Sequence, residues 1–435
     1  MKTAAVIAEY NPFHNGHLYQ LNFIREQLGA DRIIVAMSGD FAQRGIPAII
    51  DKYDRCLMAL QNGADLVIEI PSYFALGSAE YFASGAISLL DKLGVVDFIN
   101  FGSEAGNLDI INNCALILAT EPLSYSMKLK EQLKNGLSFP SARSKALWDE
   151  VNTTAHNFTV DEFQKTISSP NNVLAIEYVK ALIKRKSSII PITLKRNGDG
   201  YNDSAISSGS FSSANAIREH LAGNEGLYDS EKQSLKAVLS PLQEQLPESV
   251  YNYFSSGAFP KLMYQNDFSE ILQYRLLCDS FEGKLDTYYD VSGQIANIIN
   301  KNLPDYKSFS DFCLSCKSKE LTYTRISRSM MHILLSMKKD EIERLKNDDY
   351  SQYARVLGFT DNGLSVLKNI KANSSIPIIT KLSKVDKILS GSALASINQD
   401  IHCSQIYNCV RARKYHETAL NEYTRQIIRL PSRGY

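Results

Sequence analysis

The sequence has no long hydrophobic run and no excess of one charge. None of its apolar stretches approaches the uninterrupted length that a membrane helix needs. The short apolar run near the N-terminus ends at Glu9 without a small-residue cleavage site, so we expect a first buried strand there and not a signal peptide. Lys plus Arg and Asp plus Glu are equal at 47 each, so overall charge does not indicate a nucleic-acid-binding protein.

Cysteines are few and irregularly spaced. The seven cysteines are odd in number and scattered, which suits a reducing cytoplasm better than a disulfide framework. Cys313 and Cys316 form a CxxC, but the downstream group of His402, Cys403 and Cys409 lacks the spacing of a second zinc-binding pair. We therefore expect packing roles for these residues, no protein-bound metal centre and a cytoplasmic protein.

Apolar segments in the first half of the chain are typical of buried strands, and helical patterns separate them. Because each parallel crossover needs a helix, this alternation predicts a Rossmann-like, doubly wound parallel α/β sheet. A ligand of such a sheet lies beyond the carboxyl ends of its strands. The predicted strands are Thr3–Tyr10, Arg32–Ser38, Asp65–Ile70, Val95–Phe101 and Ser188–Arg196.

The character of the sequence changes after about residue 221. Helical patterns rich in Leu, Tyr and Lys replace the strand patterns, apart from one expected strand around Ile376–Leu382. The 435 residues, 44% of them hydrophobic, are enough for two or three domains. We expect a Rossmann-like domain over residues 1–235 and a mostly helical, locally basic region over residues 236–435.

His14-Asn15-Gly16-His17 follows the first predicted strand and opens a helix. The two histidines are three residues apart and share a face of the first turn. Helix starts leave backbone N–H groups without partners, so we expect an anion site there, with the imidazoles donating to an α-phosphate. An isolated HxxH is more often a helix cap plus a core histidine. Its place after the first strand of this sheet favours adenylyl transfer instead.

A second loop-to-helix junction, FSSANAIR, carries Ser212, Ser213, Asn215 and Arg218. Hydroxyls and N–H groups at a helix start, with an arginine one turn later, suit the β- and γ-phosphates of a nucleotide. On its own this segment is also an ordinary helix cap.

Other polar residues follow strands and are expected to converge on the same crevice. Asp40, in MSGDFAQRG, is a candidate to hold Mg²⁺ or to position an acyl substrate, although it can also cap a turn. Gly102, Arg196 and an asparagine of the SPNN segment, Asn171 or Asn172, are further candidates.

Two basic runs in the C-terminal half lie near aromatic residues. The first contains Arg325 and Arg328, and the second contains Arg411 and Arg413. Cations bind phosphates and rings stack on unpaired bases, so these runs are candidate RNA contacts. Solvated helix faces would have the same composition.

With these motifs the sequence resembles the bacterial tRNA(Met) cytidine acetate ligases, which are similar to nucleotidyltransferases with a HIGH-type motif. The resemblance extends from the first strand to past residue 360. It is carried by AEYNPFHNGHLYQL, MSGDFAQRG, DLVIEIP, FGSE, SPNNVLAIEY, FSSANAIR and RVLGFTDNG. The second junction departs from the commoner ISSTxIR form, because Ala214 and Asn215 stand where that form has a threonine.

The resemblance implies a ligase that activates acetate with ATP, together with Mg²⁺, and releases pyrophosphate. The acetyl group then passes to the exocyclic amine of the wobble cytidine of elongator tRNA(Met), giving N4-acetylcytidine. Residues 1–235 would be the ATP-binding catalytic domain and residues 236–435 the tRNA-binding region. No obligate protein partner is evident.

From their positions we expect catalytic roles for His14, His17 and Asp40 and a phosphate contact for Arg218. The resemblance implies further ATP contacts at Gly102, Asn171 or Asn172, and Arg196, and hydroxyl contacts to the polyphosphate at Ser212 and Ser213. The family's ATP segment falls on fourteen consecutive residues. They are Ile7, Ala8, Glu9, Tyr10, Asn11, Pro12, Phe13, His14, Asn15, Gly16, His17, Leu18, Tyr19 and Gln20.

Two other functions use the same motifs. A metabolic nucleotidyltransferase would join a nucleotide to a small phosphorylated cofactor precursor, but it would not need a long, locally basic helical region. A non-enzymatic RNA adaptor would hold ATP only as a structural ligand.

Overall fold

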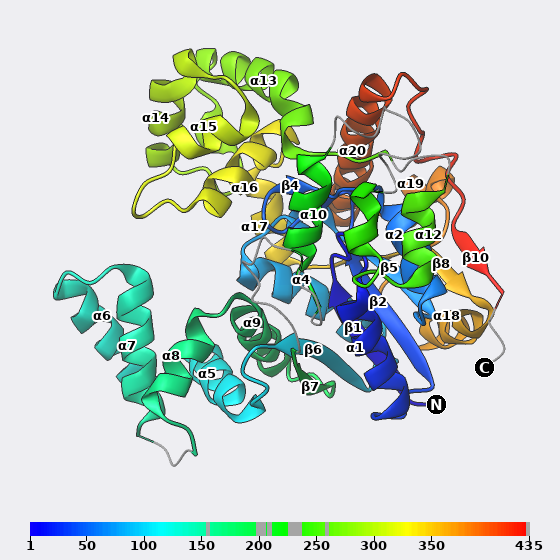
Figure 1. The fold of residues 1–435 in the computed structure, drawn as a ribbon. Helices are drawn as coiled ribbons and strands as arrows, with labels where there is room; N and C mark the ends of the chain where they lie inside the picture. Colours follow the sequence, from blue (N-terminus) through cyan, green and yellow to red (C-terminus); the bar gives the residue numbers. More distant parts are fainter. Residues whose placement is uncertain (154–156, 197–205, 207–210, 225–236, 257–260, 432–435) are drawn as a thin grey trace.

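The computed structural model describes residues 1–431 apart from 154–156, 197–205, 207–210, 225–236 and 257–260. Its centre is a sheet in the order β10-β8-β5-β2-β1-β6-β7, with β9 beside β8 (Figure 1). Five strands are mutually parallel, as predicted, and β1 pairs with β2 from Thr3 against Arg32 to Ala8 against Met37. These strands are β1 (Thr3–Ala8), β2 (Arg32–Ser38), β5 (Leu66–Ile70), β6 (Phe98–Ser103) and β7 (Ile190–Lys195).

Alternate residues of the central strands pack into two different hydrophobic cores. Ala5 and Ile34 face one core, and Ala4 and Ile33 face the other, because successive strand side chains point to opposite faces. The first core lies under α3 (Ser72–Ala75), α4 (Ala79–Lys92), α5 (Leu108–Thr120) and α9 (Pro170–Arg185). The second lies under α1 (Asn15–Glu26), α2 (Lys52–Gln61), α10 (Ala214–Gly223) and α12 (Glu248–Ser255). The doubly wound α/β fold is thereby confirmed.

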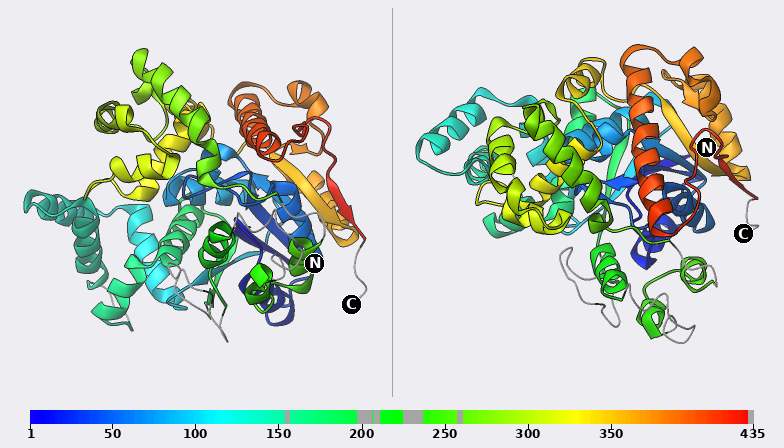
Figure 2. Two further views of the ribbon diagram at one scale, coloured as in Figure 1. Left: turned by 45° about the horizontal axis from the view of Figure 1, so that its top comes forward. Right: turned by 90° about the horizontal axis from the view of Figure 1, so that it is seen from above.

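Two helical lobes project from the same side of the sheet, which all three ribbon views show (Figures 1 and 2). One is inserted between β6 and β7 and includes α6 (Leu123–Lys134), α7 (Phe139–Val151) and α8 (Val160–Ser168). The other contains α13 (Ser269–Phe281), α14 (Gly293–Asn302), α15 (Phe309–Ser315), α16 (Tyr323–Leu334) and α17 (Lys339–Asn347). A short hairpin of β3 (Phe41–Ala42) and β4 (Ile46–Pro47) follows β2.

The C-terminal half is mostly helical, as expected, yet it returns to the central sheet. Strand β8 (Ala354–Thr360) pairs antiparallel with β5, and β9 (Ile378–Ile379) and β10 (Ile428–Leu430) run parallel to β8. The expected strand near residue 376 is therefore a two-residue edge strand, whereas β8 and β10 were not predicted. Helices α18 (Asp361–Asn373), α19 (Val385–Ile388) and α20 (Gly391–Lys414) lie between these strands in the chain.

The two regions expected from the sequence thus share one sheet. The boundary at residue 235 falls in a part of the chain outside the described residues, so this division stays a prediction. Among the residues that the structure describes, no helix is both long enough and apolar enough to cross a membrane.

A buried cluster of charges joins the N-terminal strands to the C-terminal segment. Lys52 Nζ lies 2.9 Å from Glu69 Oε1 and 3.1 Å from Glu422 Oε2, and its side chain is fully buried. Arg355 Nη1 lies 3.1 Å from Glu69 Oε2, and Arg355 also pairs with Glu422. Burial and Arg355 act to lower the pKa of Lys52, but the carboxylates around it raise that pKa above its ordinary value.

Replacing Lys52 with methionine removes the cation that three buried carboxylates share, Asp40, Glu69 and Glu422. Removing one partner of a buried ion pair strands the remaining charge, so we expect the free energy of unfolding to fall by about 3–5 kcal/mol. Urea unfolding followed by circular dichroism measures the change. Arg413→Met, which breaks an exposed pair with Glu270, is the control and should cost less than about 1 kcal/mol. Equal losses in the two variants would contradict the structural role of the cluster.

Candidate active site

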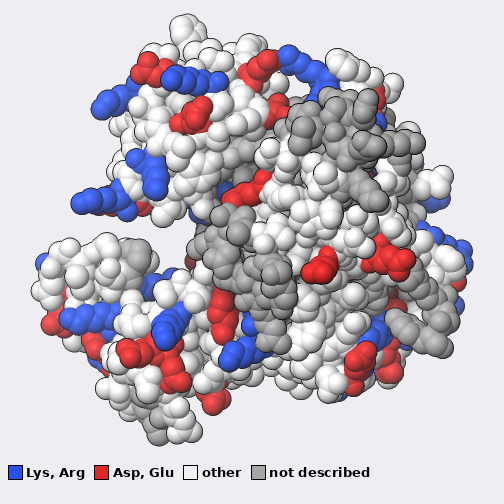
Figure 3. Space-filling model, in the orientation of Figure 1, with Lys and Arg blue, Asp and Glu red and all other residues white. Residues whose placement is uncertain are grey.

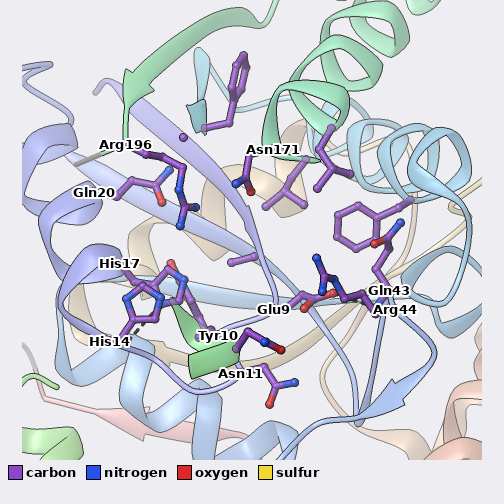
Figure 4. A pocket seen from close by; sticks show the side chains of 18 of the residues that line it. Glu9, Tyr10, Asn11, His14, His17, Gln20, Gln43, Arg44, Asn171 and Arg196 are labelled. Atoms are coloured by element: carbon purple, nitrogen blue, oxygen red, sulfur yellow. Dashed lines mark hydrogen bonds between the residues drawn. The ribbon is translucent and has the colours of Figure 1, made fainter. Parts of the chain in front are cut away.

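Two adjoining cavities lie beyond the carboxyl ends of β1, β6 and β7. Both are lined by His14, His17, Gln20, Gly102 and Arg196. The empty space in the main cavity and its open mouth is about 1060 Å³, and that in the adjoining cavity and its mouth is about 550 Å³. The remaining lining of the main cavity is Ile7, Ala8, Glu9, Tyr10, Asn11, Gln43, Arg44, Phe82, Phe101, Asn171, Leu174, Tyr178, Ala214, Asn215 and Arg218 (Figure 4). That of the adjoining cavity is Gly16, Tyr19, Leu194, Lys195, Phe211 and Ser212.

The two histidines cap the start of α1 with their own rings. His14 Nδ1 accepts a hydrogen bond from Gly16 N at 3.0 Å, and His17 Nδ1 accepts one from His14 N at 3.2 Å. The rings are stacked, with centroids 3.7 Å apart. Because each Nδ1 accepts, the proton of each neutral ring is assigned to Nε2. Both rings therefore have an Nε2–H that is not used by these backbone contacts.

The backbone N–H groups at the start of α1 are occupied, which corrects the expectation of a free anion site there. Asn15 N donates to Gln245 O at 2.9 Å, and His17 N donates to His14 O at 2.9 Å. Gly16 N donates to the His14 ring, as above. Donors for a phosphate at this helix must therefore come from the imidazoles themselves and not from the main chain.

The start of α10 faces the main cavity through Ala214 and Asn215. Ser213 Oγ caps this helix by accepting from Ala216 N at 3.1 Å. Arg218 is held by Asn11 O at 2.7 Å and by Asn215 Oδ1 at 3.0 Å. The structure thus brings Arg218 to the main cavity, whereas Ser213 has the capping role that its sequence also allowed.

Burial and nearby cations keep the histidine pair uncharged. Burial lowers the pKa of His14 to about 3, and Arg196 and Arg218 contribute to the shift. The pKa of His17 is also lowered well below its ordinary value, by burial, by His14 and by Arg196. At neutral pH both rings are therefore hydrogen-bond donors without a net charge.

Gly102 and Asn171 line the main cavity, and their contacts with ATP stay predictions. A Cβ at Gly102 would lie 3.2 Å from Arg196 Cγ, so glycine keeps the end of β6 open. Asn171 lines the main cavity, and its Nδ2 donates to Glu104 Oε1 at 2.7 Å. Asn172 is buried, and its Oδ1 accepts from Ala105 N at 3.2 Å. Of the two alternatives left open by the sequence, the structure brings Asn171 to the cavity.

Asp40 is not among the described residues that line either cavity. Its Oδ1 accepts from Lys52 N at 2.9 Å and its Oδ2 accepts from Ser404 Oγ at 2.7 Å. Gln43 and Arg44, three and four residues later, line the main cavity instead. The loop expected from the sequence therefore reaches the main cavity through Gln43 and Arg44, whereas the side chain of Asp40 is turned into the protein.

Some of the other residues predicted to contact ATP line a cavity, and some do not. Ser212 lines the adjoining cavity, and its N donates to Gln245 Oε1 at 2.7 Å. Ten of the fourteen residues of the segment from Ile7 to Gln20 line one of the two cavities. The four that do not are Pro12, Phe13, Asn15 and Leu18.

The four arginines of the basic runs differ strongly in exposure. The side chains of Arg325 and Arg413 are 42% and 71% exposed. Arg328 is 12% exposed and pairs with Asp290, and Arg411 is 9% exposed and pairs with Asp51 at 2.8 Å. Among the described residues, no cluster of three or more His, Cys, Asp or Glu side chains could hold a metal ion.

Replacing Arg196 with glutamine removes one of the cations that lower the histidine pKa values. We expect the pKa of His14 to rise and yet to stay below about 6.5, because burial remains. NMR titration of the imidazole resonances measures this shift. The wild-type spectra at pH 7 should also show the Nε2–H tautomer for both rings. Arg32→Gln is the control, because Arg32 begins β2 at the end away from the cavities. It should leave the pKa values of both histidines unchanged, and an equal rise of the His14 pKa in that variant would contradict the assigned cause.

A family model described as HIGH Nucleotidyl Transferase matches residues 1–422. A tRNA(Met) cytidine acetate ligase of Clostridium novyi is 41% identical over 88% of this chain and 91% of its own length. One of Acetivibrio thermocellus is 39% identical over 98% of this chain and its full length.

Solved structures agree with these relatives. Crystal structures of Thermotoga maritima TmcAL cover 99% of this chain and 100% of their own. The apo form is 31% identical with a TM-score of 0.87, and the form bound with alpha-thio ATP is 30% identical with a TM-score of 0.86. The family predicted from the motifs is thereby confirmed: the chain belongs to the tRNA(Met) cytidine acetate ligases, within the HIGH nucleotidyl transferases.

Proposed function

We propose that this chain is an ATP-dependent acetate ligase that acetylates the wobble cytidine of elongator tRNA(Met). In the first step an acetate oxygen attacks the α-phosphorus of ATP, and the bond to the bridging oxygen breaks to release pyrophosphate. In the second step the cytidine N4 attacks the carbonyl carbon of acetyl-adenylate, AMP leaves and one proton is lost from nitrogen. The product is N4-acetylcytidine in the tRNA, and the cytoplasm is where such a substrate is found.

The observation that carries this proposal is the uncharged imidazole pair with its two Nε2–H donors at the cavity. Negative charge builds on the oxygens of the α-phosphate during the first step, and fixed donors in a dry site stabilise it. Arg196 and Arg218 supply full positive charges beside the same cavity. The pyrophosphate would leave along Arg218 and the start of α10.

Unsatisfied polar groups also support a polar ligand in the main cavity. Tyr10 Oη and Asn11 Nδ2 are buried, and neither has a hydrogen-bond partner among the described residues. Buried polar atoms without partners are costly, so a bound ligand that satisfies them gains affinity. A relative's structure bound with alpha-thio ATP supports the identity of that ligand as ATP.

Magnesium would reach this site on the phosphates of ATP. Asp40, the carboxylate expected to hold it, already accepts hydrogen bonds at both oxygens and is turned away from the cavity. Mg²⁺ in phosphate chemistry is often held by few protein groups, with phosphate oxygens and water as its other ligands. We therefore assign no step to a protein-bound metal.

The tRNA would approach between the two helical lobes. Figure 3 shows the surface hollowed between them, with Lys and Arg on both sides of the hollow. The side chains of Arg325 and Arg413 are the more exposed of the four arginines, and each pairs with a carboxylate, Asp290 at 3.8 Å and Glu270 at 2.6 Å. We expect phosphates of the tRNA to compete for these two cations. The predicted RNA contacts at Arg328 and Arg411 stay predictions, and their buried ion pairs favour a structural role instead.

Two other functions remain distinguishable by experiment. A nucleotidyltransferase acting on a cofactor precursor would exchange pyrophosphate only with that precursor, and a non-enzymatic adaptor would not exchange it at all. The names of the relatives favour acetate and tRNA over both.

Replacing His17 with alanine removes one Nε2–H donor and the cap on His14 N. We expect the rate of acetate-dependent ATP–pyrophosphate exchange to fall by about 10²–10³-fold, as for loss of one transition-state donor. Binding of tRNA, measured by filter binding, should stay nearly unchanged. Loss of tRNA binding with exchange preserved would reverse the assignment of the two functions, and exchange without acetate in the wild type would refute the ligase.

Removing the two exposed arginines together, as Arg325→Gln with Arg413→Gln, should weaken tRNA binding and lower its dependence on salt. Each lost phosphate contact reduces the slope of log K against log salt by about 0.7–0.9. Pyrophosphate exchange should be unaffected. Arg429→Gln is the matched control, because the side chain of Arg429 is also exposed, at 66%, but lies on β10 at the edge of the sheet. An equal loss of binding in that control would mean that this surface is not the RNA site.

A further inference from the structure

The main cavity has two chemically different ends (Figure 4). His14, His17 and Arg196 lie at one end, where the phosphates of ATP would bind. Glu9 and Arg44 lie together on the other side, and Gln43 is beyond them. A carboxylate repels a polyphosphate, so the end that contains Glu9 is suited to a different part of the reaction.

Glu9 directly follows β1 and is fixed by one of its two carboxylate oxygens. Its Oε1 accepts from Gln43 N at 2.8 Å, and its backbone oxygen accepts from Arg55 Nη1 at 2.6 Å. Its Oε2 has no donor among the described residues. The carboxylate is therefore oriented by the β3–β4 loop, with one oxygen left for a ligand.

Three aromatic side chains that are largely buried also line the main cavity. Phe101 and Tyr178 have ring centroids 5.8 Å apart, and Phe82 lies 6.5 Å from Tyr178. Rings of this kind are the surfaces on which a nucleobase stacks when it is splayed out of an RNA loop. Gln43 contributes an amide that can both donate and accept.

These groups match the Watson–Crick edge of cytosine. That edge presents an N4 amine that donates and two atoms, N3 and O2, that accept. A carboxylate accepts from the amine, which is the pairing that proteins use to recognise cytosine, and the amide and guanidinium can donate to N3 and O2. The adenine of ATP also has an amine, but the adjoining cavity beside Gly16 and Gly102 offers it a place on the other side of the histidines.

Resting on the proposed function, we propose that Glu9 binds the cytidine N4 amine and accepts its proton during acetyl transfer. The N4–carbonyl bond forms, the bond from the carbonyl carbon to the AMP oxygen breaks, and the proton passes from N4 to Glu9 Oε2. AMP leaves as the other product, and Glu9 returns the proton to water. Glu9 is then a catalytic residue of the second step alone.

The test separates the two half-reactions in Glu9→Gln. The amide oxygen can still accept from Gln43 N, but the amide NH₂ faces the cytidine amine and cannot take its proton. Glu9 belongs to the segment expected to contact ATP, so we expect some loss of acetate-dependent pyrophosphate exchange, but at least tenfold less than the loss of transfer. Single-turnover transfer from preformed acetyl-adenylate to tRNA should fall about 10²-fold or more, the range for loss of a general base.

A second measurement reports on recognition of the base. Wild type should bind the tRNA more tightly than a transcript with uridine at the wobble position, because uridine has an O4 acceptor in place of the amine. In Glu9→Gln this preference should fall by about tenfold, because the amide can donate to O4. A role of Glu9 limited to holding the β3–β4 loop would change both affinities equally.

The outcomes divide clearly. Unchanged transfer in Glu9→Gln, or an equal loss of exchange and of transfer, overturns the assignment of Glu9 to the cytidine. Glu26→Gln, an exposed carboxylate on α1, is the control and should leave every readout unchanged. If the wild type itself shows no acetate-dependent exchange, then the proposed function fails, and it fails separately from the role of Glu9.

Discussion

The hydrogen bonds between two imidazole Nδ1 atoms and two backbone N–H groups determine what this site can do. A helix start needs acceptors, and at α1 His14 and His17 are those acceptors. Accepting at Nδ1 assigns the ring protons to Nε2, and the pKa of each ring is lowered by burial and by Arg196. The same interaction therefore caps the helix and produces two uncharged donors in fixed positions.

The C-terminal region, residues 236–435, contributes to this site although none of its described residues lines either cavity. Asp40 accepts from Lys52 N and from Ser404 Oγ on α20, and its backbone oxygen accepts from Ala48 N at 2.8 Å. These contacts fix the loop that carries Gln43 and Arg44. Lys52 in turn pairs with carboxylates of β5 and of the C-terminal segment. The C-terminal return to the sheet thus holds a cavity wall in place, so the N-terminal strands and the C-terminal segment form one fold.

The sequence predicted well what depends on local pattern and poorly what depends on distant partners. The five parallel strands and the place of His14 follow from apolar runs and from strand ends, and the structure confirms them. Strand β8 was missed because its seven residues, which include Arg355 and Thr360, stand among helices and its partner β5 is almost three hundred residues away. Asp40 and Arg411 were assigned to ligands because they are polar and well placed in the sequence. Each is buried against a partner from a remote segment, Ser404 and Asp51, which no local pattern reveals.

A cavity with two unlike ends also explains how one site can perform two reactions in order. The first step needs donors and positive charge around a phosphate, and the second needs an acceptor for a proton from a weakly nucleophilic amine. If the two sets of groups were mixed, a carboxylate beside the phosphates would raise the barrier of the first step. Glu9 and His14 are five residues apart, yet the turn between β1 and α1 carries them to opposite sides of the space where the acetyl-adenylate would lie. In the proposed reaction the carbonyl carbon of acetyl-adenylate then lies between the imidazole donors, which assist its formation, and Glu9, which accepts the proton of the attacking amine. The intermediate therefore need not leave the site between the two steps.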